Sequence, residues 1–402
     1  MTSNNASRLF IISEFIDGTQ NSTGYYWSKI IEGLSRKYEL IYVIGTKSSH
    51  ANILNIPNCV SYVLVNDFFY NKKKTIQRFW GQFFQSIYFA KAIIKNIRCN
   101  DVVISGTNPA LLLFYILFIK VFFCFKWILL VHDVFPENLI PARIVKSNSL
   151  VYKFAKILFD RVYLSADILI SIGRDMLELL AEKTNGQSKI EYVPNWVDLS
   201  DVVPLSRECC EGYYKNLGVD KIVFQFFGNL GRLQGIKNIL DAIALVKNEN
   251  AFFVFIGTGS EDILISNFIK RNSLKNIVQL PAVQFSKNNS VLSSCDVSIV
   301  SLESGMSGLC VPSKAYFSLA ADKPLLVISD IGSELSMLIS EEKSIGWFCE
   351  SGDSEKLASL IDSISSQSIF GMQGKARDVV VNKYGYENAV DKYSKCVSSL
   401  LT

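Results

Sequence analysis

The sequence predicts an α/β protein of two Rossmann-like, doubly wound domains that face each other across a cleft. Short apolar strands alternate with helical patterns along the chain, which is typical of parallel sheets with crossover helices. The alternation stops in a polar stretch at 194–221 and then starts again. The length of 402 residues suits two domains of about two hundred residues each.

The first half carries its expected strands as short apolar runs. Helical spacing of apolar residues is clearest at 27–34, 150–164 and 174–182. We therefore expect a first domain over residues 1–200. Its expected strands are 8–13, 39–44, 60–65, 102–105, 127–131, 168–171 and 190–193.

The second half repeats this organisation over residues 201–375, and a helix at 376–402 is expected to return toward the first domain. Ligands of open parallel sheets bind beyond the carboxyl ends of the strands. The ligand cleft is therefore expected between the strand ends of the two halves. The strands expected in the second half are 222–227, 252–256, 297–300 and 325–328.

Composition narrows the class of protein. The chain is 49% hydrophobic and 19% charged, so it is globular and not disordered. Nine cysteines without paired spacing, and no recognisable secretory signal, predict a reducing compartment. Only two histidines are present, which excludes a multi-histidine metal site. The net charge of +4 says little about nucleic acid.

A glycine-rich loop follows the expected strand 222–227 and leads at once into a helical pattern. Such a loop offers backbone N–H groups and a helix N-terminus to an anion. A second stretch, at 312–316, places Ser313 and Lys314 at the start of another expected helix. Alone, the first loop fits a tight strand–helix turn equally well. Together, the loops predict a diphosphate clamp in which Arg232 and Lys314 supply the charge.

Basic and aromatic residues interleave between Phe68 and His132. This span holds nine cations and a single acid, Asp101. The pattern is typical of a surface that binds anionic lipid, and nucleic acid is the competing partner. We expect a membrane surface and no nucleic acid. The cations are Lys72, Lys73, Lys74, Arg78, Lys91, Lys95, Arg98, Lys120 and Lys126.

The apolar run 111–123 lies within this span. Because Lys120 interrupts it and a strand is expected at 127–131, we predict a helix of about a dozen residues followed by a turn. Three interpretations remain open. The helix packs in the core, dips into the membrane interface, or spans the bilayer, which needs roughly 20 residues.

Motifs through most of the chain carry a resemblance to a known family. They lie at 132–138, 165–171, 193–198, 257–261, 312–316 and 320–325. On these motifs the sequence resembles the GT-B glycosyltransferases of the family 4 type. The stretches 132–138 and 312–316 resemble the subgroup of colanic-acid-type and L-fucosamine transferases, which build bacterial surface polysaccharides.

The resemblance implies transfer of a sugar, such as N-acetyl-L-fucosamine, from a UDP-sugar to a saccharide on polyprenyl diphosphate. It implies O-antigen or capsule assembly by a peripheral protein at the cytoplasmic face of the bacterial plasma membrane. Retention of configuration and no metal cofactor are implied as well. Two alternatives stay open: a nucleotide-sugar 2-epimerase of the same fold, and a membrane assembly protein without catalysis.

The chain departs from the family pattern at two points. Asn229 and Gln234 stand where the family usually has Arg and Lys on the phosphate loop. Glu303 matches the first of the family's paired glutamates, but the second position falls on Val311 or, aligned through the Ser-Lys motif, on Phe317. The resemblance implies a donor site made of Gly24, Gly228, Asn229, Arg232, Gln234, Gly257, Glu303, Gly305, Ser313 and Lys314.

Three residues near the end of the expected strand 127–131 are candidate catalytic groups. His132 follows the strand directly, at the expected cleft, although a lone histidine is equally often structural. Asp133 and Glu137 can bind sugar hydroxyls or act as a base toward the acceptor. Glu137 has a second interpretation, in which it only caps the following segment. For Gly24, an ordinary helix entry is as plausible as a binding role.

Overall fold

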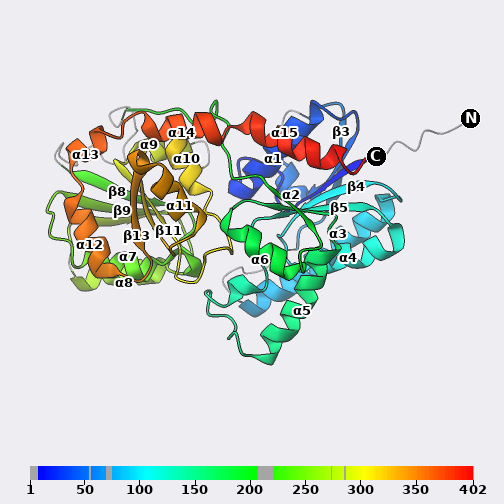
Figure 1. Ribbon diagram of the computed structural model, residues 1–402, viewed down its shortest axis with the longest axis horizontal. Helices are drawn as coiled ribbons and strands as arrows, with labels where there is room; N and C mark the ends of the chain where they lie inside the picture. Colours follow the sequence, from blue (N-terminus) through cyan, green and yellow to red (C-terminus); the bar gives the residue numbers. More distant parts are fainter. Residues whose placement is uncertain are drawn as a thin grey trace, which may run out of the picture.

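Two α/β halves lie side by side in the protein, each built on one parallel sheet (Figure 1). The structure, a computed structural model, describes residues 8–53, 56–68, 75–206, 221–272, 274–284 and 287–401. The predicted fold class, two facing doubly wound domains, is confirmed. The exact domain limits remain a prediction, because the first sheet ends at Tyr192 and the second begins at Ile222.

The first sheet has seven parallel strands in the order β3-β2-β1-β4-β5-β6-β7. Its strands are β1 (Leu9–Ile12), β2 (Ile41–Thr46), β3 (Val60–Val65), β4 (Val102–Gly106), β5 (Lys126–Val131), β6 (Ile168–Ser171) and β7 (Lys189–Tyr192). The inner strands are mostly apolar and buried because helices cover both faces of the sheet. All seven expected strands are therefore present, with shifts of a residue or two at the ends.

Helices cover the two faces of the first sheet unequally. α3, α4 and α5 lie on one face, and α1 lies on the other with the last helix of the chain (Figure 1). The helices are α1 (Ser22–Ser35), α2 (Lys47–His50), α3 (Thr75–Asn96), α4 (Leu112–Phe123), α5 (Leu150–Ser165) and α6 (Asp175–Lys183), with a 3-10 turn η1 (Glu137–Leu139).

The second sheet has six parallel strands in the order β10-β9-β8-β11-β12-β13. They are β8 (Ile222–Phe227), β9 (Ala251–Ile256), β10 (Ile277–Leu280), β11 (Val297–Ser301), β12 (Leu325–Ser329) and β13 (Gly346–Glu350). β10 and β13 were not predicted from the sequence. Both are edge strands with partly exposed residues, so neither forms the continuous apolar run by which the inner strands were predicted.

The helices of the second half also divide between two faces, with α7, α8 and α12 together on one of them. They are η3 (Arg232–Gln234), α7 (Ile236–Ile243), α8 (Asp262–Asn272), α9 (Asn288–Ser293), α10 (Lys314–Ala320), α11 (Glu334–Glu341), η5 (Lys343–Ile345), α12 (Ser354–Ser363) and α13 (Ser366–Phe370). α14 (Lys375–Lys383) and α15 (Tyr386–Ser398) then run back along the molecule, so the chain after 375 forms two helices.

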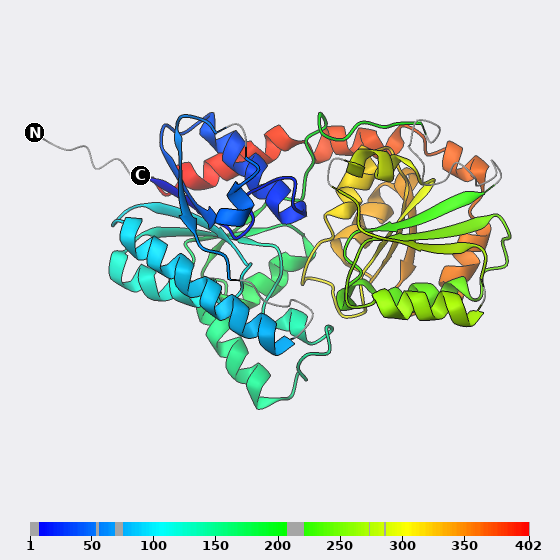
Figure 2. The same cartoon turned by 180° about the vertical axis from the view of Figure 1, so that it is seen from behind.

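The last two helices connect the halves. α14 packs on α10 of the second half, whereas α15 crosses over and packs on α1 of the first (Figure 2). Where the chain crosses, the N–H of Val197 donates to the carbonyl oxygen of Tyr384 at 3.1 Å. The two crossings are therefore hydrogen-bonded to each other at the junction of the halves.

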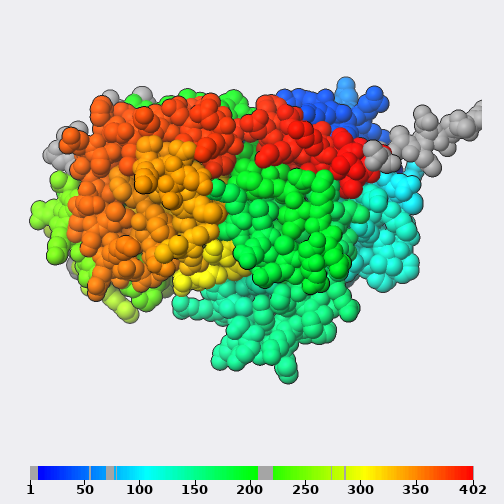
Figure 3. Space-filling model, viewed as in Figure 1, coloured from blue at the N-terminus to red at the C-terminus, as the bar shows by residue number. Residues whose placement is uncertain are grey.

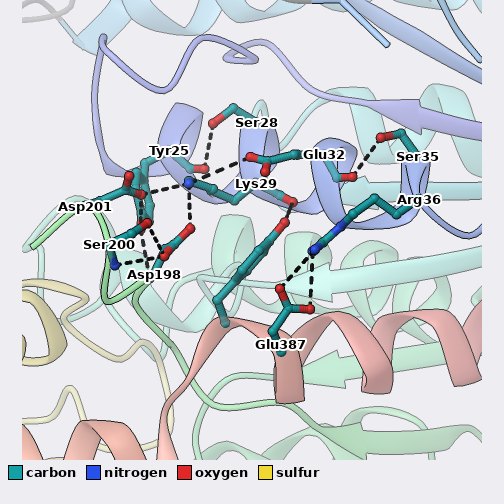
Figure 4. Close-up of polar contacts among 11 residues, drawn as sticks. Tyr25, Ser28, Lys29, Glu32, Ser35, Arg36, Asp198, Ser200, Asp201 and Glu387 are labelled. Atoms are coloured by element: carbon teal, nitrogen blue, oxygen red, sulfur yellow. Dashed lines mark hydrogen bonds and ion pairs between the residues drawn. The ribbon is translucent and has the colours of Figure 1, made fainter. Parts of the chain in front are cut away.

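Polar contacts connect this junction to α1 (Figure 4). The ammonium of Lys29 lies 2.7 Å from Asp198 and 2.9 Å from Asp201, and the hydroxyl of Tyr25 donates to Asp201 at 3.0 Å. The pKa of Lys29 is raised because these carboxylates outweigh the effect of its partial burial. Apolar residues of both halves form one continuous core at this side.

α4 confirms the short helix predicted within the apolar run 111–123. Ile116 and Ile119 are buried in the core, whereas Phe118 and Phe122 are 64% and 66% exposed. Within the described residues, no helix combines the length and apolarity that a bilayer crossing requires. α4 thus packs in the core along one side and presents apolar side chains to the surroundings along the other.

The basic and aromatic belt is the span from Phe68 to His132, and only part of it lies within the described residues. Residues 72–74 lie outside the described residues. Lys120 and Lys126 pair with Asp167 at 2.5 and 3.9 Å, so this acid from outside the span offsets part of their charge. Among the described side chains, the exposed cations of the belt are Lys91, Lys95, Arg98 and Lys126.

Candidate functional site

Two glycine turns pack against each other at the carboxyl ends of β8 and β9. A Cβ added to Gly257 would lie 1.8 Å from the carbonyl oxygen of Gly228, and both glycines have positive φ, +147° and +131°. The N–H of Leu230 donates to the carbonyl oxygen of Thr258 at 3.0 Å. Only glycine at 257 allows the two loops to approach this closely.

Lys314 begins α10 and points back toward β8. Its ammonium donates to Oε1 of Gln234 at 2.9 Å and lies 3.4 Å from the centre of the Phe226 ring. Burial lowers the pKa of Lys314 well below its ordinary value. Within the described residues, no carboxylate forms an ion pair with it. The structure thus brings Lys314 and Gln234 together, as the expected donor site requires.

Arg232 and Asn229 lie on the same loop as Gln234 and are exposed. No hydrogen bond or ion pair links the Arg232 side chain to the described part of the chain. Ser313 precedes α10, and its side chain does not cap the helix. The carboxyl edge of the second sheet therefore carries one exposed guanidinium, from the loop after β8, and the partly buried cation Lys314, from the start of α10.

The loop after β11 contributes Glu303 and Gly305. The backbone N–H of Glu303 donates to Leu233 in the β8 loop at 2.9 Å. The N–H groups of Gly305 and Ser307 both donate to one oxygen of Asp330, at 2.9 and 3.0 Å. The φ of Gly305 is +83°, a conformation that favours glycine. These bonds order the loop next to the glycine-rich loop after β8.

Glu303 also reaches the first half. Its carboxylate pairs with the guanidinium of Arg143 at 3.1 Å. Both side chains line a hollow of about 190 Å³ between the halves, together with Asn238 at the start of α7. The amide nitrogen of Asn238 is buried and has no hydrogen-bond partner among the described residues.

His132 and Asp133 lie where the halves touch. The N–H groups of both residues donate to Oγ1 of Thr107 at 3.2 Å. Burial lowers the pKa of His132 to about 4, so its imidazole is neutral near pH 7. Asp133 forms an antiparallel bridge with Cys310, which precedes Lys314 by four residues. The strand-end position predicted from the sequence therefore brings both residues to the contact between the halves.

Glu137 belongs to a different cluster. Its carboxylate oxygens lie 2.7 and 2.8 Å from the ammonium of Lys183, whose side chain is fully buried, and 3.2 Å from Lys156. Asp160 completes the cluster at 2.6 Å from Lys183. Two cations thus hold this carboxylate inside the first half, and its partners differ from those of His132 and Asp133. A catalytic role for Glu137 remains a prediction.

Gly24 lies in the first turn of α1, where its N–H donates to the side chain of Asn21. A Cβ at this position would lie 2.1 Å from the carbonyl oxygen of Asp17. The geometry thus accounts for this glycine by a close backbone contact at the helix entry. A role for Gly24 in donor or acceptor binding remains a prediction.

Sequence reasoning missed a second contact between the halves. The carboxylate of Glu334, 1% exposed, accepts from the backbone and side chain of Arg174 at 2.6 and 3.1 Å. The hydroxyl of Tyr192 donates to the same carboxylate at 3.0 Å. Next to it, Asp175 accepts from the N–H of Gly308 at 2.9 Å. Arg174 and Glu334 are 160 residues apart, so no local pattern signals the pair.

Comparisons with known proteins place these features in context. The model of the family described as "Glycosyl transferases group 1" matches residues 215–384. A protein of Pseudomonas aeruginosa named probable glycosyltransferase WbjE is 41% identical over 404 residues, covering 98% of this chain and 99% of the relative. A putative colanic acid biosynthesis glycosyl transferase, WcaI of Escherichia coli, is 21% identical over 43% of each chain.

Solved structures share the fold. Sucrose-phosphate synthase from Thermosynechococcus elongatus superposes with a TM-score of 0.79 at 14% identity, covering 98% of this chain and 99% of that one. Anabaena HepE in complex with UDP gives 0.71 at 13% identity over 98% and 100% of the chains. WaaG, described as a glycosyltransferase of lipopolysaccharide biosynthesis, gives 0.69 at 11% identity over 97% and 99%.

Proposed function

We propose that this chain, which belongs to the group 1 glycosyltransferases and has the GT-B fold, transfers a sugar from a UDP-sugar to a polyprenyl diphosphate-linked saccharide. The proposed pathway is the assembly of a bacterial surface polysaccharide. The name of the colanic acid relative supports this pathway, and the HepE structures with UDP and UDP-glucose support the donor class.

The desolvated Lys314 is the observation that carries the proposed donor site. A cation held without a carboxylate is costly to the fold and gains most from an anion. With the exposed Arg232 it supplies two positive charges at the carboxyl edge of the second sheet. These charges would stabilise the diphosphate as it leaves the sugar, which is the largest electrostatic demand of glycosyl transfer.

The proposed sugar and acceptor lie between this edge and the first half. Asp133 contacts the loop that leads to Lys314, and His132 directly precedes Asp133. These two residues are the groups proposed to face the sugar or the acceptor hydroxyl. Glu303 would face the sugar from the second half. We propose retention of configuration and no metal cofactor for this transfer, and a deoxyhexosamine such as N-acetyl-L-fucosamine as the sugar.

A donor panel tests the proposal. Membranes that contain the enzyme are incubated with radiolabelled UDP-, GDP- and dTDP-sugars, and products are separated into lipid-linked and free forms. The proposal predicts label in a lipid-linked saccharide from a UDP-sugar. A free, epimerised sugar would point instead to a 2-epimerase. Label transferred from GDP- or dTDP-sugars alone would contradict the proposed nucleotide.

A further inference from the structure

α5 carries apolar side chains on the side that faces away from the protein. Leu150, Phe154 and Ile157 are 82%, 65% and 56% exposed. Their spacing of four and three residues places them on one side of the helix, while Val162 and Tyr163 are buried on the other. A helix on a water-facing surface normally presents polar residues there. The outer side of α5 therefore lacks the partner that its composition calls for.

The charged residues of the segment that carries most of this side are all cations. Between residues 138 and 159 the sequence contains no acidic residue. Arg143, Lys146 and Lys153 of this segment are exposed. Apolar side chains rimmed by cations are the combination that binds an anionic bilayer, in which the apolar groups enter the acyl boundary and the cations meet the lipid phosphates.

The helix is also placed where lipid can reach it. Its first turn projects from the lower edge of the molecule, beyond the rest of the first half (Figure 3). The loop that leads into this turn carries Arg143, which pairs with Glu303 beside the hollow between the halves. A membrane held at α5 would thus lie next to the opening of the site.

We propose that the outer side of α5 inserts into the surface of an anionic bilayer and holds the enzyme at the membrane. The proposal deepens the proposed function, since it rests on an acceptor anchored in lipid. It names an element that is separate from the belt on α3 and α4. Self-association fits this side less well, because two copies related by a twofold axis would bring Lys146 and Lys153 against like charges.

Vesicle flotation of the purified full chain tests the proposal without donor or acceptor. The test variant is Leu150→Ser/Phe154→Ser/Ile157→Ser. The matched control is Ile263→Ser/Ile331→Ser/Phe370→Ser, which removes side chains that are 73%, 68% and 73% exposed on the second half. Vesicles of phosphatidylcholine, with or without phosphatidylglycerol, separate the apolar from the charge contribution.

We expect the wild type and the control to float with the anionic vesicles, and the wild type to bind neutral vesicles more weakly. The α5 variant should lose on the order of 100-fold or more in partitioning, because three large apolar groups no longer leave water. Lys146→Glu/Lys153→Glu should weaken binding to anionic vesicles alone. This second variant decides the outcome if the serine variant does not fold, as judged by its thermal unfolding.

Equal flotation of the wild type and a folded α5 variant would overturn the proposal. A wild-type dimer that the α5 variant converts to a monomer, with vesicle binding unchanged, would identify a second copy of the chain as the occupant. Because the vesicles carry no substrate, the result of the flotation experiment does not depend on the result of the donor panel. Loss of transfer with intact flotation would contradict the proposed function alone.

Discussion

The ammonium of Lys314 lies 3.4 Å from the centre of the Phe226 ring, where only the amide oxygen of Gln234 accepts a hydrogen bond from it within the described structure. The ring face and the amide dipole stabilise the ammonium charge of Lys314 less than a carboxylate would. The fold therefore holds a cation whose pKa is lowered by burial. A bound diphosphate would supply the missing negative charge.

Lys314→Met should raise the stability of the ligand-free protein. Because the pKa of Lys314 is lower in the folded than in the unfolded state, its charge costs stability at low pH, and the cost disappears as pH rises toward the unfolded value. Removing about 1 kcal/mol of this cost would raise Tm by roughly 2–4 °C for a domain of this size. Calorimetric unfolding near neutral pH measures the shift.

Lys237→Met is the control, since Lys237 is 72% exposed and pairs with Asp241. We expect its Tm to remain within about 1 °C of the wild type, because exposed ion pairs contribute little. A Tm that falls in Lys314→Met but not in the control would show that the ammonium stabilises the empty fold, contrary to our interpretation.

His132 should make the protein sensitive to acid. Burial lowers its pKa to about 4, below the ordinary value of about 6.5. The unfolded chain therefore binds a proton between these values, and stability falls as pH falls from about 6.5 to about 4, by at most about 3 kcal/mol. In urea unfolding, the free energy of unfolding of His132→Asn should fall less over this pH range than that of the wild type. An equal fall in the free energy of unfolding of both proteins would show that the imidazole titrates normally in the folded state.

The same substitution separates structure from function in the site. If His132 faces the sugar or the acceptor, His132→Asn should lower turnover and leave UDP affinity nearly unchanged. Asp133→Asn should behave likewise. Full turnover in a folded His132→Asn would assign this histidine to the contact between the halves alone.

The strands and their alternation could be predicted because burial on both faces of a parallel sheet demands continuous apolar runs, as in β5 and β8. The glycine turn after β8 could be located because its glycines mark it, and the binding of phosphate there remains a prediction. The partners of Glu137 could not be predicted, since Lys183 is brought to it by the packing of α6. The burial of Lys314 over Phe226 likewise depends on tertiary packing and leaves no spacing signal.

Glu334→Gln should weaken the contact between the halves. The substitution keeps the shape of the side chain but leaves Arg174 without the buried carboxylate that it meets at 2.6 and 3.1 Å. Because the Arg174 side chain is 31% exposed, solvent offsets part of the loss. We expect a cost of roughly 1–3 kcal/mol in urea unfolding.

Glu341→Gln removes the other acid that contacts Arg174, at 2.5 Å. This carboxylate is 46% exposed, so its loss should cost less than about 1 kcal/mol. Equal costs for Glu334→Gln and Glu341→Gln would mean that burial of the carboxylate between the halves adds nothing to the pair.

The salt dependence of membrane binding tests the basic belt. Screening weakens attraction between exposed cations and anionic lipid, but it leaves apolar insertion in place. We expect high salt to release part of the protein from isolated membranes and detergent to release all of it. Replacing residues 72–74 with glutamate should weaken membrane binding already at low salt, because the cations that attract anionic lipid are gone. A protein that stays wholly in the membrane-free fraction of cells would contradict the membrane assignment.

Calorimetric titration of UDP into the purified protein tests the central claim, that Arg232 and Lys314 hold the donor diphosphate. Loss of one charge-assisted contact costs roughly 1.5–3 kcal/mol, so Arg232→Ala and Lys314→Ala should each bind UDP about 10- to 100-fold more weakly. Lys270→Ala, at an exposed site in the last turn of α8, should bind as the wild type does. Unchanged UDP affinity in both Arg232→Ala and Lys314→Ala, with the fold intact, would contradict the account.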